Sequence, residues 1–113
     1  MTFTTHQLNP NGPLYSSFGA DPELGEIVEL FVEEMPSRIE TLVEQYTSHN
    51  WEGLRQTAHQ LRGAAGSYGF DDISPTAARL ERFLEASEPE ETVRNAVEQL
   101  VDVCSRARAG VPD

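Results

Sequence analysis

The sequence predicts an all-α protein, an antiparallel four-helix bundle with a short N-terminal helix or arm. Apolar residues recur three and four positions apart in four successive segments, which is the spacing of one face of an α-helix. No segment alternates between apolar and polar residues over many positions, so strands are not expected. The later connections are short, which favours antiparallel neighbours whose axes lie about 20° apart.

The chain is predicted to divide into an N-terminal arm over residues 1–20, the bundle over 21–108 and a C-terminal tail over 109–113. The arm begins with polar residues and with asparagine, proline and glycine, which are typical of turns. Residues 13–18 could form a short helix whose apolar side chains pack on the bundle.

The first helix is predicted to start at Asp21, with Pro22 at its first helical position and Glu23 in its first turn. Its apolar stripe consists of Leu24, Val28, Phe31, Met35, Ile39, Leu42 and Tyr46. Pro36 lies inside this stretch and should kink or split the helix. Because the stripe resumes in phase after the proline, one kinked helix is favoured.

Asn50 is predicted to cap the second helix, and Gly69 is placed to end it in a left-handed conformation. The stripe of this helix consists of Trp51, Leu54, Ala58, Leu61, Ala65 and Tyr68. Trp51 is expected to anchor the start of the helix.

The last two helices have equally regular stripes. Ser74 and Pro75 are predicted to start the third helix, and Ser87 with Glu90 matches a capping box for the fourth. The third stripe consists of Ile73, Ala77, Leu80 and Leu84, and the fourth of Val93, Val97, Leu100, Cys104 and Ala107.

The composition is that of one soluble domain. The chain has 113 residues, of which 38% are hydrophobic, and its formal net charge of -11 argues against nucleic acid or an anionic membrane as a partner. The single cysteine, Cys104, allows no intramolecular disulfide and no thiolate metal cluster. There is neither a signal peptide nor an apolar run of about 18 residues, so a cytoplasmic location is expected. The first and last residues favour a freestanding protein.

The charges are unevenly distributed along the chain. Residues 53–70 contain no carboxylate, although the whole chain has 19 acids against 8 bases. Within this stretch lie Arg55, His59 and Arg62. A local positive field is therefore expected in a negative protein, and it would suit a small anion.

On a helical wheel at about 100° per residue, His59 falls roughly 130° from the centre of the core stripe, so its imidazole should point away from the core. Its neighbours at spacings of three and four are Arg55, Gln56, Arg62 and Gly63, and Gly66 follows on the same side. Each of the two glycines costs a helix interior about 1 kcal/mol relative to alanine. A chain accepts that cost where something must approach its backbone closely, although Gly66 could equally serve helix packing.

This arrangement suits a histidine that becomes phosphorylated. A neutral imidazole is a competent nucleophile near pH 7 because its unperturbed pKa is about 6.5. Phosphoryl transfer requires in-line access and compensation of negative charge. Gly63 would leave the imidazole accessible, and Arg62 would compensate the negative charge of the phosphoryl group. Arg55 is a second candidate for compensating that charge. Alternatively, Arg55 and Arg62 are solvated or pair with acids, and His59 is a surface residue without function.

Residues 58–69, AHQLRGAAGSYG, resemble the signature of histidine-containing phosphotransfer (HPt) domains: Ala-His-x-Leu-Lys-Gly, with another glycine ten positions after the histidine. Arg62 takes the place of the usual lysine, which keeps the charge but not the geometry. The matching residues are Ala58, His59, Leu61, Gly63 and Gly69. The resemblance extends from about Asp21 to about Arg106 and includes Leu80-Glu81, where the family has Leu-Glu.

The resemblance implies a phosphocarrier without kinase activity of its own, which accepts a phosphoryl group on His59 from one receiver domain and passes it to another. The implied partners are response-regulator receivers and a hybrid sensor histidine kinase. The implied Mg²⁺ belongs to the receiver, so no cofactor is expected on this chain, and a monomer suffices. Glu81 would hydrogen-bond the second nitrogen of His59 and hold its tautomer. Alternatively, Glu81 is a surface acid paired with Arg55 or Arg82.

A second reading remains open, a helical-bundle adaptor that binds a protein partner and never carries phosphate. Neither His6 nor His49 has cysteine, aspartate or glutamate at metal-ligand spacing, so both are expected to be surface residues and no metal site is predicted. A hydrolase is disfavoured because no serine or cysteine triad is suggested.

Overall fold

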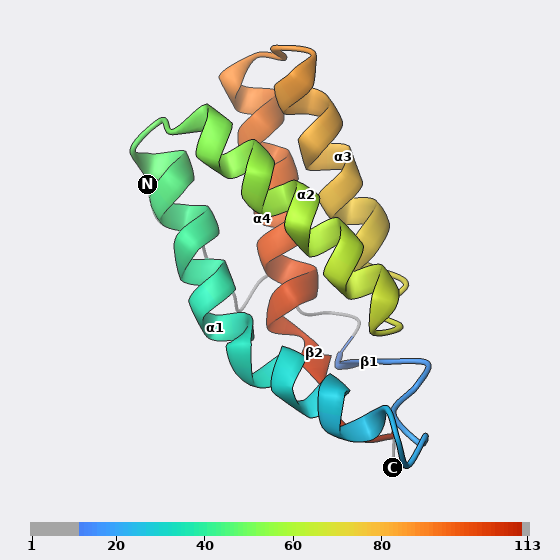
Figure 1. Ribbon diagram of the computed structural model, residues 1–113. Coiled ribbons are helices and arrows are strands. Elements are labelled where there is room, and N and C mark those ends of the chain that lie inside the picture. Colours follow the sequence, from blue (N-terminus) through green and yellow to red (C-terminus); the bar gives the residue numbers. More distant parts are fainter. Residues whose placement is uncertain (1–11, 112–113) are drawn as a thin grey trace.

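The computed structural model describes residues 12–111, and helices make up most of this span (Figure 1). They are α1 (Gly25–Thr47), α2 (Trp51–Ser67), α3 (Ile73–Glu85) and α4 (Glu90–Ser105), and they are flanked by two short strands, β1 (Leu14–Tyr15) and β2 (Ala107–Arg108). Consecutive helices run in opposite directions, and each packs against the next while α1 also packs against α4. The predicted antiparallel four-helix bundle is confirmed.

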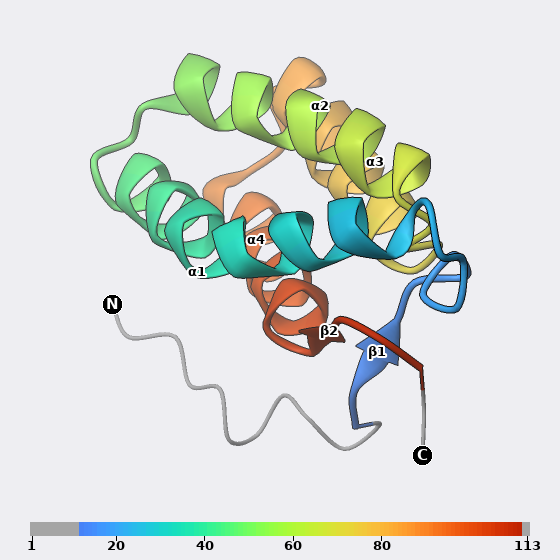
Figure 2. The same cartoon turned by 60° about the horizontal axis from the view of Figure 1, so that its bottom comes forward.

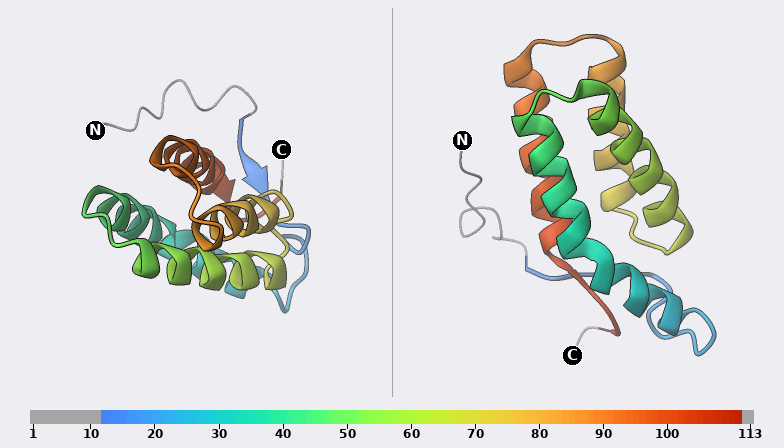
Figure 3. Two further views of the ribbon diagram at one scale, coloured as in Figure 1. Left: turned by 90° about the horizontal axis from the view of Figure 1, so that it is seen from above. Right: turned by 60° about the vertical axis from the view of Figure 1, so that its left-hand side comes forward.

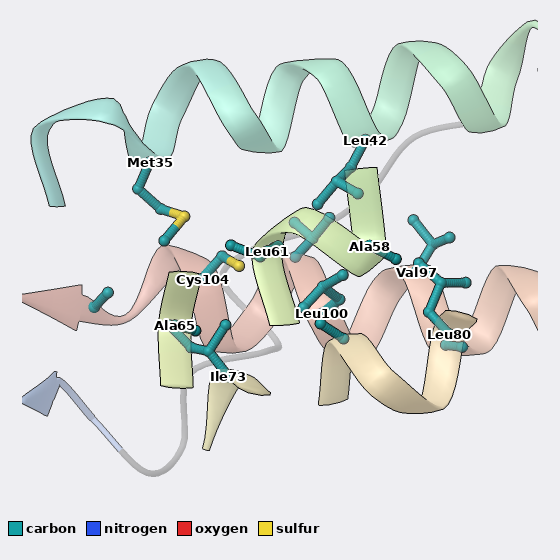
Figure 4. Packing of buried hydrophobic residues seen from close by; sticks show 14 of the residues in the cluster. Met35, Leu42, Ala58, Leu61, Ala65, Ile73, Leu80, Val97, Leu100 and Cys104 are labelled. Carbon is teal, nitrogen blue, oxygen red and sulfur yellow. The ribbon is translucent and has the colours of Figure 1, made fainter. Parts of the chain in front are cut away.

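The four apolar stripes meet in one core (Figure 4). Each helix contributes a fully buried leucine, namely Leu42, Leu61, Leu80 and Leu100. Burying a side chain of this size contributes about 1.5–3 kcal/mol, whereas isolated helices of this length are marginal in water. The packing of the stripes therefore stabilises the helices far more than their intrinsic propensities do.

The longest helix, α1, contains Pro36 in its interior and changes direction along its length, as Figure 3 shows. Proline removes one backbone hydrogen bond and crowds the preceding turn, which accounts for the predicted kink. The predicted start of the first helix at Asp21 is wrong, because α1 begins at Gly25. Asp21 instead caps the turn before α1, since its Oδ1 accepts from the N–H groups of Glu23 at 2.7 Å and Leu24 at 3.0 Å. Within residues 12–111, no helix combines the length and the hydropathy needed to cross a membrane.

Both predicted ends of α2 are confirmed. The side chain of Asn50 accepts a hydrogen bond from the N–H of Gly53 at 3.0 Å, which satisfies one of the free donors at the helix start. At the other end Gly69 has a φ of 81°, in the left-handed region that glycine adopts without strain.

Replacing Gly69 with alanine is expected to lower the free energy of unfolding by about 2 kcal/mol or more. A Cβ at this position would lie 2.7 Å from the hydroxyls of Ser16 and Ser17, in addition to the backbone strain. Gly110→Ala is the matched control, since Gly110 has a φ of 84° and a Cβ there would meet nothing within 4 Å. Urea unfolding of both variants measures the difference, and equal losses would contradict the steric part of this prediction.

The predicted short helix over residues 13–18 is wrong, and two short strands occur although no strands were expected. β1 pairs in parallel with β2, with Leu14 opposite Ala107, and the two strands lie side by side in Figure 2. The N–H of Leu14 donates to the carbonyl of Arg106 at 2.8 Å. A helix of six residues forms too few hydrogen bonds to offset the free-energy cost of nucleation. The backbone groups of this segment bond to the chain that leaves α4 instead. The part of the predicted arm over residues 1–11 lies outside the described residues.

The predicted capping box is also wrong. Ser87 has a φ of 54° and belongs to the turn that ends α3, with its N–H donating to the carbonyl of Leu84. α4 begins at Glu90 after Pro89, and no side chain caps it. A serine in the left-handed conformation that terminates one helix is not available to cap the next. Ala107, placed on the fourth stripe, is buried but belongs to β2.

Cys104 lies in the core as predicted, and burial raises the pKa of its thiol from 9.0 to about 12. The folded state therefore favours the neutral thiol, and this contribution to stability is fully present below about pH 9 and is lost as the pH rises toward 12. We expect a thiol reagent at about pH 8 to label the native protein at least about a hundredfold more slowly than the urea-unfolded chain. Equal labelling rates would contradict this burial.

Candidate functional site

His59 lies in the middle of α2 and turns its imidazole out of the core, as its wheel position predicts. Its side chain is 56% exposed. The neighbouring stripe residues Ala58 and Leu61 are fully buried, so the core face of α2 fixes the direction in which His59 points. The structure thus presents one half-exposed imidazole on the flank of the bundle.

Glu81, on α3, holds one nitrogen of this imidazole. Its Oε2 lies 2.7 Å from Nδ1 of His59, and its side chain is only 7% exposed. An ionised carboxylate can only accept hydrogen bonds, so Nδ1 carries the proton and donates it to Glu81. The lone pair of the neutral imidazole is then on Nε2. The alternative of a surface acid paired with Arg55 or Arg82 is wrong, because the core position of Leu80 turns the next residue of α3 toward α2.

Arg62 lies against the same pair of side chains. Its Nη1 is 3.3 Å from Oε1 of Glu81, and its Nη2 is 3.1 Å from Nδ1 of His59. The guanidinium cannot hydrogen-bond an Nδ1 that already carries a proton, because both groups are donors. The contact with Glu81 is an ion pair without hydrogen-bond geometry, which leaves Oε1 without a hydrogen bond. Arg62 therefore contributes charge beside the imidazole.

The structure does not bring Arg55 and Gln56 to the imidazole. Two nitrogens of Arg55 lie 2.6 and 3.2 Å from the carboxylate of Glu52, and Gln56 donates to the same carboxylate at 3.4 Å. The hydrogen bond from Arg55 lowers the pKa of Glu52 and raises the pKa of Arg55. Because each arginine of the carboxylate-free stretch pairs with an acid from outside it, the positive field at His59 is weaker than the distribution of charges along the sequence indicates. The roles of Arg55 and Gln56 stay predictions.

The two glycines of α2 have different surroundings. A Cβ on Gly63 would meet nothing within 4 Å, so the surface beside His59 is open there. A Cβ on Gly66 would lie 3.4 Å from the hydroxyl of Ser74, which indicates close packing of α2 against α3. The same hydroxyl donates to the carbonyl of Arg62 at 2.9 Å. Ser74 was missed as part of this region, since its sequence context indicates only a helix start.

His49 stands apart from this site, at the end of α1. Its Nε2 lies 3.3 Å from Oε1 of Glu90, and its ring stacks on Trp51 with 5.1 Å between centroids. His6 lies outside the described residues. Among residues 12–111, no group of three or more histidines, cysteines or acids is placed to hold a metal ion.

A half-exposed histidine whose Nε2 has no partner among residues 12–111, oriented by a buried carboxylate on a helical bundle, is an arrangement able to bind a group on its imidazole. Residues 26–110 match the model of the Hpt domain family, and this span covers most of the chain. The chain therefore belongs to the Hpt domain family, whose members are phosphocarriers in phosphorelays and interact with response-regulator receiver domains. No curated protein and no solved structure matches it.

Proposed function

We propose that His59 is the phosphoryl-carrying residue, that its Nε2 accepts the group from an aspartyl phosphate of one receiver domain, and that an aspartate of another receiver removes it. The contact between Nδ1 of His59 and Oε2 of Glu81, at 2.7 Å, is the observation that carries this proposal. It leaves a lone pair on Nε2, which has no hydrogen-bond partner among residues 12–111. The family role supports the same conclusion.

In the forward step, the Nε2 lone pair forms a bond to phosphorus while the bond between phosphorus and the aspartyl oxygen breaks. The aspartate leaves as a carboxylate, and His59 becomes an imidazolium that still holds its Nδ1 proton. The carboxylate of Glu81 lies against that proton, so it stabilises the positive charge that the ring gains. In the second step an aspartate of the next receiver attacks phosphorus, and Nε2 recovers its lone pair.

Two residues of α2, Arg62 and Gly63, are assigned to this transfer. Arg62 compensates the negative charge of the transferred group, because its guanidinium is already within 3.1 Å of the ring. Gly63 leaves room for the receiver, since no side chain occupies that position. We assign Arg55, Gln56 and Gly66 to the rim of the partner-binding surface and not to the chemistry.

An exposed apolar surface lies on α1 near the end of α2. Ile27 is 40% and Leu30 is 57% exposed, and the adjacent Phe31 contacts Tyr68 with 5.2 Å between ring centroids. Exposed apolar side chains of this size are typical of interaction surfaces. We propose that receiver domains dock across this part of α1 and the outer face of α2.

The receiver would bring Mg²⁺, so this chain needs neither a metal nor kinase activity of its own. A hybrid sensor histidine kinase is the proposed source of the phosphoryl group. A monomer suffices for this carrier role, and it would act in the cytoplasm, where receivers operate.

The direct test is phosphotransfer from a radiolabelled receiver to the protein and to its His59→Gln variant. The expected result is acid-labile, base-stable label on the unchanged protein and none on the variant. Gln60→Ala, which alters the next residue of α2, is the control that should keep the label. Absence of label with every receiver from the same cell would instead favour a helical-bundle adaptor, and label that persists in His59→Gln would place the phosphoryl group elsewhere.

A further inference from the structure

A pocket of about 370 Å³ lies at the end of the bundle where the α1–α2 and α3–α4 connections meet. Its walls come from the first residue of α2, the last turn of α3, the α3–α4 connection and the first turn of α4. The lining residues are Trp51, Leu84, Ser87, Glu88, Glu90 and Val93. None of these residues takes part in the site around His59.

The pocket lies along the same helix pair as His59. Trp51 precedes His59 by eight residues, which is about two turns and about 12 Å along α2. Leu84 follows Glu81 by about one turn of α3. A standard interface covers about 800 Å² on each partner, a disc of about 16 Å radius. A receiver centred on Nε2 of His59 would therefore extend far enough along the helix pair to come level with this pocket.

The walls of the pocket combine an aromatic ring with carboxylates. Trp51 is 37% exposed although it stacks on His49 and meets Tyr46 edge-on at 5.8 Å. Within residues 12–111, Glu88 makes no ion pair. In the same span, Glu90 makes an ion pair only with His49, at 3.3 Å. Within the described residues, the two carboxylates beside this exposed indole thus have no arginine partner.

We propose that this pocket receives an arginine side chain of the receiver domain that docks on His59, an assignment that rests on the proposed function. The aliphatic stem would contact Leu84 and Val93, and the guanidinium would face the indole of Trp51 and the carboxylate of Glu88. An arginine combines a positive charge with a planar face and a fork of donors, and no acidic or neutral side chain offers all three. Arg62 at one end of the docking surface and these acids at the other would set the orientation and choice of receiver.

The first experiment uses the fluorescence of Trp51, the only tryptophan of the chain. The probes are N-acetyl-L-arginine amide and its neutral citrulline analogue. The expected result is a saturable change with the arginine probe only, weakened about threefold or more by Glu88→Gln. Glu85→Gln is the matched control, because it removes the same charge from an exposed residue of α3 that does not line the pocket. Identical responses to both probes, or no response, would overturn the assignment.

The second experiment measures transfer from a phosphorylated receiver to the same two variants. Glu88→Gln is expected to raise KM about threefold to tenfold and to change kcat less than KM. Glu85→Gln is expected to change KM less than about twofold. Binding of the arginine probe together with an unchanged KM would overturn the assignment to the receiver. Failure of the proposed function has a different signature, because no receiver would then label His59 even when the probe binds Trp51.

Discussion

Replacing Glu81 with alanine is expected to slow phosphoryl transfer to His59 about a hundredfold. The variant removes the acceptor that holds the Nδ1 proton at 2.7 Å, so the imidazole can rotate and can place its proton on Nε2, where it blocks attack. Single-turnover transfer from a phosphorylated receiver measures the rate. Nitrogen NMR of the imidazole should show the Nδ1–H tautomer in the unchanged protein and its loss in the variant.

Glu81→Gln is the matched control for this prediction. Its amide oxygen can still accept from Nδ1, so the tautomer should persist and the rate should fall only about tenfold, from the loss of a charge-assisted hydrogen bond. Because Glu81 also faces Arg62, urea unfolding of both variants must show that the bundle remains folded. Equal rates for the alanine variant and the unchanged protein would mean that Glu81 does not orient His59.

Replacing Gly63 with glutamine is expected to make the protein more stable and the transfer slower. A Cβ at this position would meet nothing within 4 Å, and glutamine is a better helix former than glycine, so the free energy of unfolding should rise by about 0.5–1 kcal/mol. The same side chain would occupy the space through which the receiver approaches His59, and transfer should slow about a hundredfold. Urea unfolding and single-turnover transfer measure the two effects.

Asn95→Gln tests whether a larger side chain anywhere on the surface slows phosphoryl transfer. Asn95 is an exposed residue of α4, a helix that is not a packing neighbour of α2 in the bundle. This variant should transfer at the unchanged rate. If Gly63→Gln were destabilising, its glycine would have a packing role within the bundle. A stable variant with full transfer would show instead that receivers do not approach over Gly63.

The local elements of the fold were largely predictable from the sequence. Stripe spacing located the four helices, and Asn50 and Gly69 marked the ends of α2 because capping depends on one residue and its immediate neighbours. The errors occurred where the residues of a local signal were engaged in another interaction. The segment around Leu14 pairs with the chain after α4, and Ser87 ends α3 instead of capping α4.

In the candidate site, too, some features were predictable from the sequence and others were not. The exposure of His59 follows from its place on one helix, so the wheel predicted it correctly. The charge around His59 was not predictable in this way, because Glu52 and Glu81 lie outside the carboxylate-free stretch and still reach its two arginines. Counting charges within the stretch misses both pairs. Glu52 meets Arg55 one turn away on the same helix, and the packing of α3 on α2 brings Glu81 to Arg62.

The sequence by itself determined the four helices, their core faces and the histidine that faces outward, because these depend on spacing within single helices. Only the tertiary structure decided which carboxylate lies against that histidine. Glu81 is 22 residues from His59, and it reaches Nδ1 because of the rotation and register with which α3 packs on α2. That packing also aligns the pocket at Trp51 with His59, so the proposed receiver surface is a property of the helix pair.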